Sequence, residues 1–121
     1  ARWPFDSFTL AASTTITTAM VPGAICMNSV NFAADYDVTL PVAEEGFWIE
    51  MFWRYNVTTS SNKGLKVKNA GGTTLVDLTV IVWPAGEHHY WIRLAVYDNN
   101  GTLEWTAAYQ KVDWSGAVGL I

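Results

Sequence analysis

Apolar and polar side chains alternate along much of the chain with a period of two residues. The clearest case is the stretch 47–55, in which the alternate positions Phe47, Ile49, Met51, Trp53 and Tyr55 are all apolar. Successive side chains of a β-strand point to opposite faces, so this set forms one continuous core-facing row. We therefore expect residues 47–55 to form the central strand of a β-structure.

The same period recurs in shorter runs on both sides of this stretch. The expected strands cover residues 5–10, 13–19, 24–27, 36–40, 65–68, 76–82, 90–96 and 102–110, and the first two of them are expected to form a pair. Gly, Pro and Asn residues separate these runs. Asp98-Asn99-Asn100-Gly101 supplies residues that tolerate positive φ, which predicts a hairpin turn between the last two strands.

Several short strands joined by turns predict an all-β protein. The length of 121 residues fits one domain with a sizeable core. We expect a single domain spanning residues 1–121, folded as an antiparallel, jelly-roll-like β-sandwich of about eight strands. No window of a dozen residues shows the 3.6-residue spacing of an amphipathic helix.

The composition adds a prediction about assembly. Hydrophobic residues make up 50% of the chain and charged residues only 15%, which is apolar for a protein of this size. A small monomer that exposed this excess would carry adhesive patches. Burial against another subunit is therefore favoured, and we expect a homo-oligomer, either a trimer or a dimer.

The net charge, the cysteine content and the start of the chain limit the partners, the disulfides and the cellular location that we expect. The net charge of −4 disfavours a nucleic acid, and no apolar run approaches the length of a membrane span. Cys26 is the only cysteine, so no intrachain disulfide can form. The start Ala-Arg-Trp-Pro lacks the basic-then-apolar layout of a signal peptide, which favours synthesis in the cytoplasm.

Few residues suit catalysis or metal binding. His88 and His89 are the only histidines, and as neighbours on a strand they point to opposite faces, so they do not readily share a metal. Glu44 and Glu45 precede Gly46, where charge commonly solvates a turn. We expect no enzyme activity, no metal and no cofactor.

A set of outward aromatic and arginine residues needs a different explanation. The outward row of the central strand carries Trp48 and Phe52 beside Glu50 and Arg54, and we expect the two charged residues to pair across strands. Arg93 is expected to stack on a Trp such as Trp91, or to pair with an acid across a subunit contact. The candidate binding residues are Trp48, Phe52, Arg54, Trp83, Trp91, Arg93 and Tyr97.

Three uses of these rings stay open at this point. They can form the buried centre of a protein interface, where Trp, Tyr and Arg are enriched. They can be covered by another segment of the same chain, or they can stack on sugar rings. The preference of large rings for burial favours the interface.

Three segments carry a resemblance to a known group of proteins. Asp35–Met51, Gly64–Leu75 and Gly101–Trp105 resemble, in their Thr-Leu-Pro, Gly and apolar strand succession, small β-structured virion proteins of tailed bacteriophages, namely capsid decoration or cement proteins and fibre domains. The resemblance covers roughly residues 35–106. It implies dimers or trimers that sit on the capsid lattice and bridge neighbouring capsomers without catalysing a reaction.

Residue pattern and resemblance together predict a phage structural protein. We expect a homo-oligomer located in the virion that binds the major capsid protein or another virion protein and stabilises the capsid surface. The alternative is a carbohydrate-binding domain of a phage receptor-binding or tail-tip protein, with a glycan as its ligand.

Overall fold

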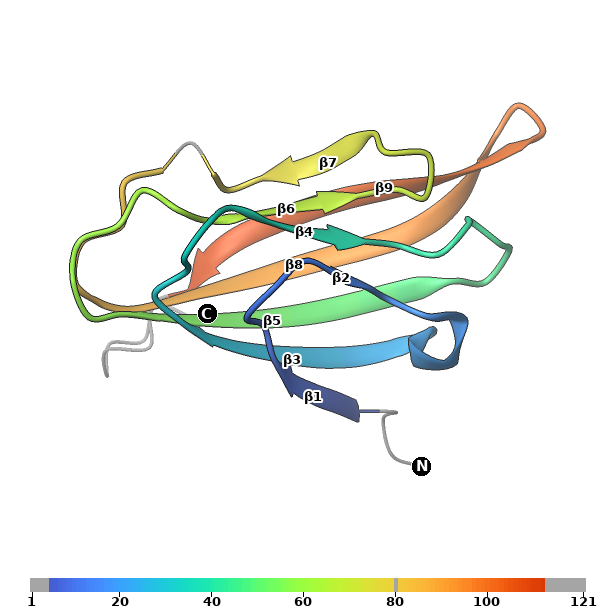
Figure 1. The fold of residues 1–121 in the computed structure, drawn as a ribbon. Coiled ribbons are helices and arrows are strands. Elements are labelled where there is room, and N and C mark those ends of the chain that lie inside the picture. The colour runs from blue at the N-terminus through green and yellow to red at the C-terminus, as the bar shows by residue number, and fades with distance from the viewer. Residues whose placement is uncertain (1–4, 80, 113–121) are drawn as a thin grey trace.

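The computed structural model describes residues 5–79 and 81–112, which form two β-sheets packed face to face (Figure 1). This part of the chain contains nine strands and one short 3₁₀ helix, η1 (Thr18–Met20), and no α-helix. It includes no helix that is long and apolar enough to cross a membrane. The predicted all-β, two-sheet architecture is confirmed, with nine strands in the described residues where about eight were expected.

The larger sheet has five strands in the order β1, β3, β5, β8, β9. Their bounds are β1 Phe5–Thr9, β3 Gly23–Val30, β5 Trp48–Val57, β8 Gly86–Asn99 and β9 Thr102–Val112. The smaller sheet has the order β2, β4, β6, β7, with β2 Thr14–Thr15, β4 Tyr36–Thr39, β6 Leu65–Lys68 and β7 Thr74–Asp77. Strand β5 is the middle strand of the larger sheet, as its aromatic pattern predicts.

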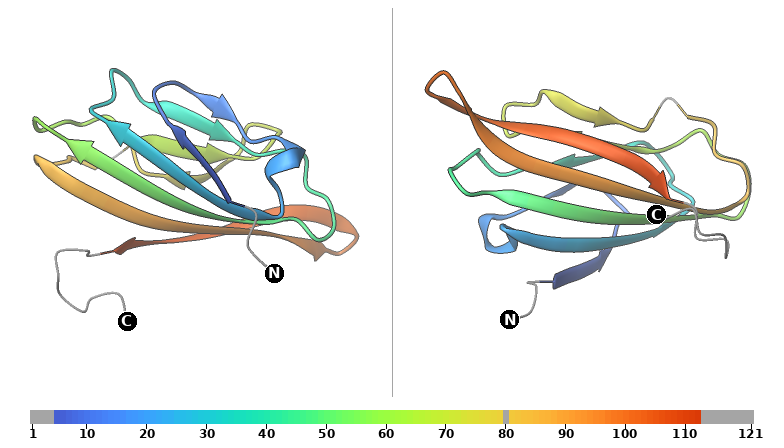
Figure 2. Two further views of the ribbon diagram at one scale, coloured as in Figure 1. Left: turned by 90° about the horizontal axis from the view of Figure 1, so that it is seen from below. Right: turned by 180° about the vertical axis from the view of Figure 1, so that it is seen from behind.

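The first six strands alternate between the two sheets. Strands β1, β3 and β5 lie in the larger sheet, β2, β4 and β6 lie in the smaller one, and neighbours within each set pair in parallel. Strand β7 then folds back antiparallel on β6, and β8 and β9 form a long antiparallel hairpin beside β5. Seen from behind in Figure 2, the long strands of the larger sheet lie side by side.

The prediction of an antiparallel, jelly-roll-like sandwich is wrong in its strand directions. Four of the seven strand pairings in the described residues are parallel, whereas a jelly roll is built from antiparallel Greek keys. The predicted pairing of segments 5–10 and 13–19 is also wrong, because the two segments lie in different sheets: β1 pairs with β3, and β2 pairs with β4. Side chains alternate alike in parallel and antiparallel strands, so the apolar pattern does not specify strand direction.

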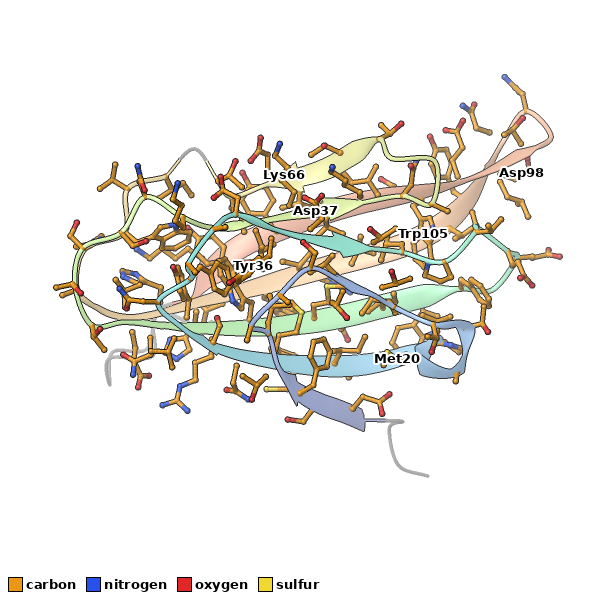
Figure 3. The ribbon with its side chains drawn as sticks, in the orientation of Figure 1. Met20, Tyr36, Asp37, Lys66, Asp98 and Trp105 are labelled. Atoms are coloured by element: carbon orange, nitrogen blue, oxygen red, sulfur yellow. The ribbon has the colours of Figure 1, made fainter. Side chains whose placement is uncertain are left out.

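The core lies between the sheets. The fully buried residues come from both layers and include Ile25, Met27, Ile49, Met51, Trp53, Tyr55 and Ile92 from the larger sheet, and Val38, Leu65 and Val67 from the smaller one. Trp105 of β9 points between the layers (Figure 3), where its indole N–H donates a hydrogen bond of 2.9 Å to the carbonyl of Pro41. The inward row of β5 is therefore the centre of the core.

The strand expected over residues 76–82 ends early in the structure. Strand β7 stops at Asp77, whose carboxylate accepts hydrogen bonds from both the backbone N–H and the hydroxyl of Thr79. Such side-chain turns replace the hydrogen bonds of a sheet, and here they also lower the pKa of Asp77. Val82 is 69% exposed, and Val80 of the same predicted row lies outside the described residues.

Candidate functional site

The larger sheet turns one surface away from the smaller sheet, and we call this surface the outer face. Its side chains alternate with the buried rows of β5 and β8, whose antiparallel register pairs Glu50 with Arg93 and Phe52 with Trp91. Six of the seven predicted site residues lie on the outer face, and they are Trp48, Phe52, Arg54, Trp91, Arg93 and Tyr97. The strand register therefore gathers them on one surface.

The rings of Phe52 and Trp91 form a stacked pair at the centre of the outer face. Their centroids are 5.7 Å apart and their planes are inclined by only 16°. Both side chains are half-buried, so part of each ring remains accessible from outside. The pair forms an apolar centre between the charged pairs Glu50–Arg93 and Arg54–Glu87.

The carboxylate of Glu50 contacts both Trp91 and Arg93 on one side of the stacked pair. One of its carboxylate oxygens accepts a 3.0 Å hydrogen bond from the indole N–H of Trp91 and lies 3.4 Å from Nε of Arg93. The guanidinium of Arg93 also lies over the Trp91 ring, 5.3 Å from its centroid. The predicted stacking of Arg93 on Trp91 is confirmed, and the acid that pairs with Arg93 belongs to the same chain.

The carboxylate of Glu87 contacts Arg54 and His89 on the other side of the stacked pair. Its carboxylate accepts hydrogen bonds of 3.2 and 2.6 Å from Nε and Nη2 of Arg54, and it lies 3.4 Å from Nε2 of His89. The bonds from Arg54 lower the pKa of Glu87 and raise the pKa of Arg54 itself. Burial lowers the pKa of His89, and this effect outweighs the attraction of Glu87.

Two shallow hollows flank the stacked rings. The first, of about 530 Å³, lies between Trp48, Glu50, Arg93, Ala95, Thr106 and Ala108. The second, of about 320 Å³, lies between Cys26, Phe52, Arg54, Glu87, His89 and Val112. Each hollow thus has an aromatic ring, an arginine and a glutamate in its lining. This combination suits a group that has one apolar side and one polar or negatively charged edge.

Trp83 does not belong to this site, contrary to the prediction that it faces outward. Only 1% of its surface is exposed, and its ring packs between Trp53, Tyr55 and Tyr90 with centroid distances of 5.2 to 5.6 Å. The backbone of Trp83 pairs with that of Ser61 in an isolated bridge, outside the regular strands. The alternation expected over 76–82 therefore does not extend to this residue.

Tyr97 lies on the outer face near the β8–β9 hairpin, away from the stacked rings. It is 45% exposed, and its hydroxyl donates a 3.2 Å hydrogen bond to the carboxylate of Glu104. This bond raises the pKa of Tyr97. Tyr97 therefore extends the outer face toward the hairpin and does not line either hollow.

The residues considered for catalysis are spread over the molecule. His88 points into the core, where its Nε2–H donates to the carbonyl of Pro84 at 2.8 Å, whereas His89 points to the outer face. Glu44 and Glu45 are exposed in the turn before Gly46. Within residues 5–79 and 81–112, no three His, Cys, Asp or Glu side chains are placed to hold a metal ion.

Sequence reasoning missed several residues that complete the site. Glu87 lies just before the strand expected at residues 90–96, so nothing in the sequence showed that it faces Arg54 across the sheet. Thr106 and Ala108 of β9 line the first hollow, but small outward side chains carry no recognisable signal. The missing information was the pairing register, because it decides which residues of different strands become neighbours.

Comparisons with known proteins add no family to this description. No protein-family model matches the chain, and searches of curated proteins and of solved structures found no significant match.

Proposed function

We propose that this chain is a non-enzymatic structural protein of a phage virion that binds and stabilises a capsid surface, acting as a homo-oligomer of the decoration or cement type. Its contact surface is the outer face of the five-stranded sheet. The partner is the major capsid protein or another virion protein. The observation that carries the proposal is the Phe52–Trp91 stack with an arginine on each side of it along the strands, each arginine paired with an acid of the same chain.

The composition of the outer face supports a protein partner. The centres of protein interfaces are enriched in aromatic residues and arginine, which is the content of the rows around Phe52 and Trp91. Glu50 and Glu87 pair with the arginine heads before any partner arrives, which restricts part of their side-chain freedom in advance. Arg93 is 65% exposed in its side chain, so it remains accessible to an acidic group of the partner.

The parallel strands supply a second argument. Parallel sheet strands are normally covered on both faces, whereas antiparallel sheets tolerate water on one side. Strands β3 and β5 pair in parallel, and their outward rows place Cys26 beside Phe52. Covering this part of the outer face with a partner gives these strands the environment that parallel strands usually have.

A capsid-binding assay with single-residue variants tests the proposal. We expect Trp91→Ala to weaken binding to purified capsids by about 2 kcal/mol or more, equivalent to about thirtyfold, as for a central interface residue. Arg93→Ala is expected to weaken it as well. Lys66→Ala, on the smaller sheet, is the matched control and is expected to bind like the unaltered chain. Unchanged capsid binding by folded Trp91→Ala and Arg93→Ala proteins contradicts the proposal.

The second candidate is a carbohydrate-binding domain of a receptor-binding or tail-tip protein. The first hollow favours it, because Trp48 offers a ring for a sugar face while Glu50 and Arg93 offer polar partners for its hydroxyl or carboxylate groups. A glycan array combined with tryptophan fluorescence separates the two candidates. Glycan-dependent quenching without capsid binding favours the sugar ligand, and the reverse result favours the structural role.

A further inference from the structure

Strand β9 is by far the longest edge strand in the described part of the chain. The sheet orders leave four edges, formed by β1 and β9 in the larger sheet and by β2 and β7 in the smaller one. Strand β9 has eleven residues, whereas the other three edge strands have five, two and four. Short edges protect a protein from pairing with other chains, and β9 lacks this protection.

The sequence of β9 carries few other features that discourage pairing. Its register with β8 runs without a shift from Thr102 to Val112, so no bulge twists the edge away. It contains no proline, and its charged residues are limited to Glu104 and Lys111. Among residues 5–79 and 81–112, no strand pairs with the other side of β9. An unpaired edge of this length offers its backbone N–H and C=O groups to a further strand.

The side of β9 that faces the smaller sheet is only partly covered. Leu103 and Tyr109 alternate with the outward row, yet they remain 39% and 52% exposed. The neighbouring edge of the smaller sheet is β7, which has four residues and is too short to cover both ends of β9. The exposed edge therefore combines free backbone groups with apolar side chains.

We propose that β9 pairs antiparallel with β9 of a second copy, about a twofold axis that passes through Ala107 perpendicular to the sheet. In this register Trp105 of one copy lies opposite Tyr109 of the other, which makes a cross-strand aromatic pair in each half of the contact. Glu104 lies opposite Gln110, and Leu103 lies opposite Lys111, so no like charges face each other. Small residues, Thr106 opposite Ala108 and Ala107 opposite itself, occupy the centre.

The second copy is the natural occupant because antiparallel pairing of a strand with itself is self-complementary. The result is one continuous sheet of two five-stranded halves. A twofold axis perpendicular to that sheet keeps both outer faces on the same side. Thr106 and Ala108, which line the first hollow, lie beside the axis, so the two hollows become neighbours. Such a dimer can engage one extended surface through both faces at once.

Two double variants test whether the chain dimerises through the free edge of β9 and whether the two strands align about Ala107. Thr106→Glu with Ala108→Glu places glutamates opposite each other twice across the axis, and we expect a monomer. Thr106→Lys with Ala108→Glu places lysine opposite glutamate at the same two positions, and we expect a dimer. Both sites are exposed, and the variants differ only at residue 106, so they serve as matched controls for folding. Size exclusion with light scattering over a concentration series gives the mass, compared with 13.4 kDa for one chain.

Each combination of masses either supports or overturns the β9 dimer. A dimeric unaltered chain, a monomeric Glu/Glu variant and a dimeric Lys/Glu variant support the proposal. A monomeric unaltered chain overturns it, as does a Glu/Glu variant that remains dimeric. Loss of the dimer in both variants overturns the register at Ala107. Disulfide formation by Ala107→Cys in a Cys26→Ser background under an added thiol oxidant is a second measurement, and failure of the oxidised dimer to crosslink there also overturns the register.

The β9 dimer rests on the homo-oligomer part of the proposed function and specifies its interface, whereas attachment to a capsid through the outer face is tested separately. Trp91→Ala is expected to weaken attachment without changing the mass of the protein, because Trp91 lies on β8 rather than on the edge. The Glu/Glu variant is expected to change the mass even if no capsid is ever bound. A monomeric unaltered chain therefore contradicts both the β9 dimer and the homo-oligomer of the proposed function, whereas unchanged capsid binding by Trp91→Ala contradicts only attachment through the outer face.

Discussion

Ser29 shows how one small polar residue satisfies buried groups in an apolar core. Its hydroxyl oxygen accepts a 2.8 Å hydrogen bond from the indole N–H of Trp53, and its own O–H donates to the carbonyl of Arg54 at 3.3 Å. Ser29 is 4% exposed and Trp53 is 1% exposed, so water cannot replace the serine. The polar residue is therefore part of the support for the central aromatic row.

Removing this hydroxyl leaves the indole N–H of Trp53 buried without a partner. We expect Ser29→Ala to lower the free energy of unfolding by about 1–3 kcal/mol, measured by urea denaturation. Ser7→Ala is the control, because Ser7 is exposed on the edge strand β1, and it is expected to have little effect. Equal stability of the Ser29→Ala and unaltered proteins contradicts the role given to this hydrogen bond.

His89 makes stability depend on pH in a defined direction. Burial lowers its pKa from the ordinary value of 6.5, so near and below that pH the unfolded chain binds a proton that the folded chain does not. The free energy of unfolding is therefore expected to fall as the pH drops through 6.5 and to be insensitive to this group above it. Glu87 acts separately, because its pKa is lowered from 4.5 and its contribution is lost only in more acidic solution.

Urea denaturation of His89→Gln on both sides of pH 6.5 checks this expectation. The variant is expected to lose the dependence of its unfolding free energy on pH between neutral and mildly acidic solution, while the loss of the Glu87 contribution in more acidic solution remains. If the unfolding free energy of His89→Gln depends on pH as strongly as that of the unaltered chain, a group other than His89 causes the dependence. The unaltered chain and Lys66→Ala are measured in parallel as controls, and both are expected to keep the pH dependence of the unfolding free energy.

Among the elements, the β8–β9 hairpin follows most directly from its sequence. Asn100 and Gly101 occupy the two-residue turn with φ values of 52° and 89°, as the predicted positive-φ turn requires. The Gly101 N–H donates a 2.7 Å hydrogen bond to the carboxylate of Asp98, which lies at the hairpin tip (Figure 3). Local chemistry alone therefore determines where this hairpin turns.

Gly101→Ala tests the backbone requirement of that turn. An alanine forced into the left-handed region is strained, and we expect the free energy of unfolding to fall by about 1–2 kcal/mol. Gly71→Ala is the matched control, since Gly71 has no positive φ and an added Cβ meets its nearest atom at 3.5 Å. Chemical denaturation of both variants gives the comparison. A Gly101→Ala protein as stable as Gly71→Ala contradicts this reading of the turn.

The elements also show where prediction from the sequence fails. The rows of β5 and β8 follow from side-chain alternation, and so does the placement of Trp48, Phe52, Trp91 and Arg93 on the outer face. Strand ends do not follow from it, because a local turn such as the one between Asp77 and Thr79 interrupts an apolar pattern that continues past it. Trp83 follows this turn, and for this reason it is buried instead of facing outward as the alternation predicts.

At the scale of the whole molecule, the sequence does not show which strands pair with one another or in which direction. Turn signals favour hairpins, and only β6–β7 and β8–β9 are hairpins of consecutive strands in the described chain. The parallel pairs β1–β3 and β3–β5 are each separated by a strand of the other sheet, so no local sequence feature records them. The two sheets and the outward row could be predicted, but the register that joins Arg54 to Glu87 could not.

This winding has a consequence for folding. Strands β1 to β6 alternate between the layers, so neither sheet can acquire its parallel pairs unless the chain also crosses the other layer. The core row of β5 contacts residues from both sheets, which couples the two layers energetically. We therefore expect a single cooperative unfolding transition, with tryptophan fluorescence and far-ultraviolet circular dichroism changing together.

The alternation of β1 to β6 between the two sheets also predicts slow folding. Pairing strands that are distant in the sequence requires loop closure before the contacts form, so we expect refolding in milliseconds to seconds rather than microseconds. Stopped-flow refolding with pulsed hydrogen exchange is the measurement, and amide protons of β4 and β6 are expected to gain protection together with those of β3 and β5. Early protection of β3 and β5 while β4 and β6 still exchange freely contradicts the coupling, since it requires the larger sheet to form its parallel pairs without the strands that connect them.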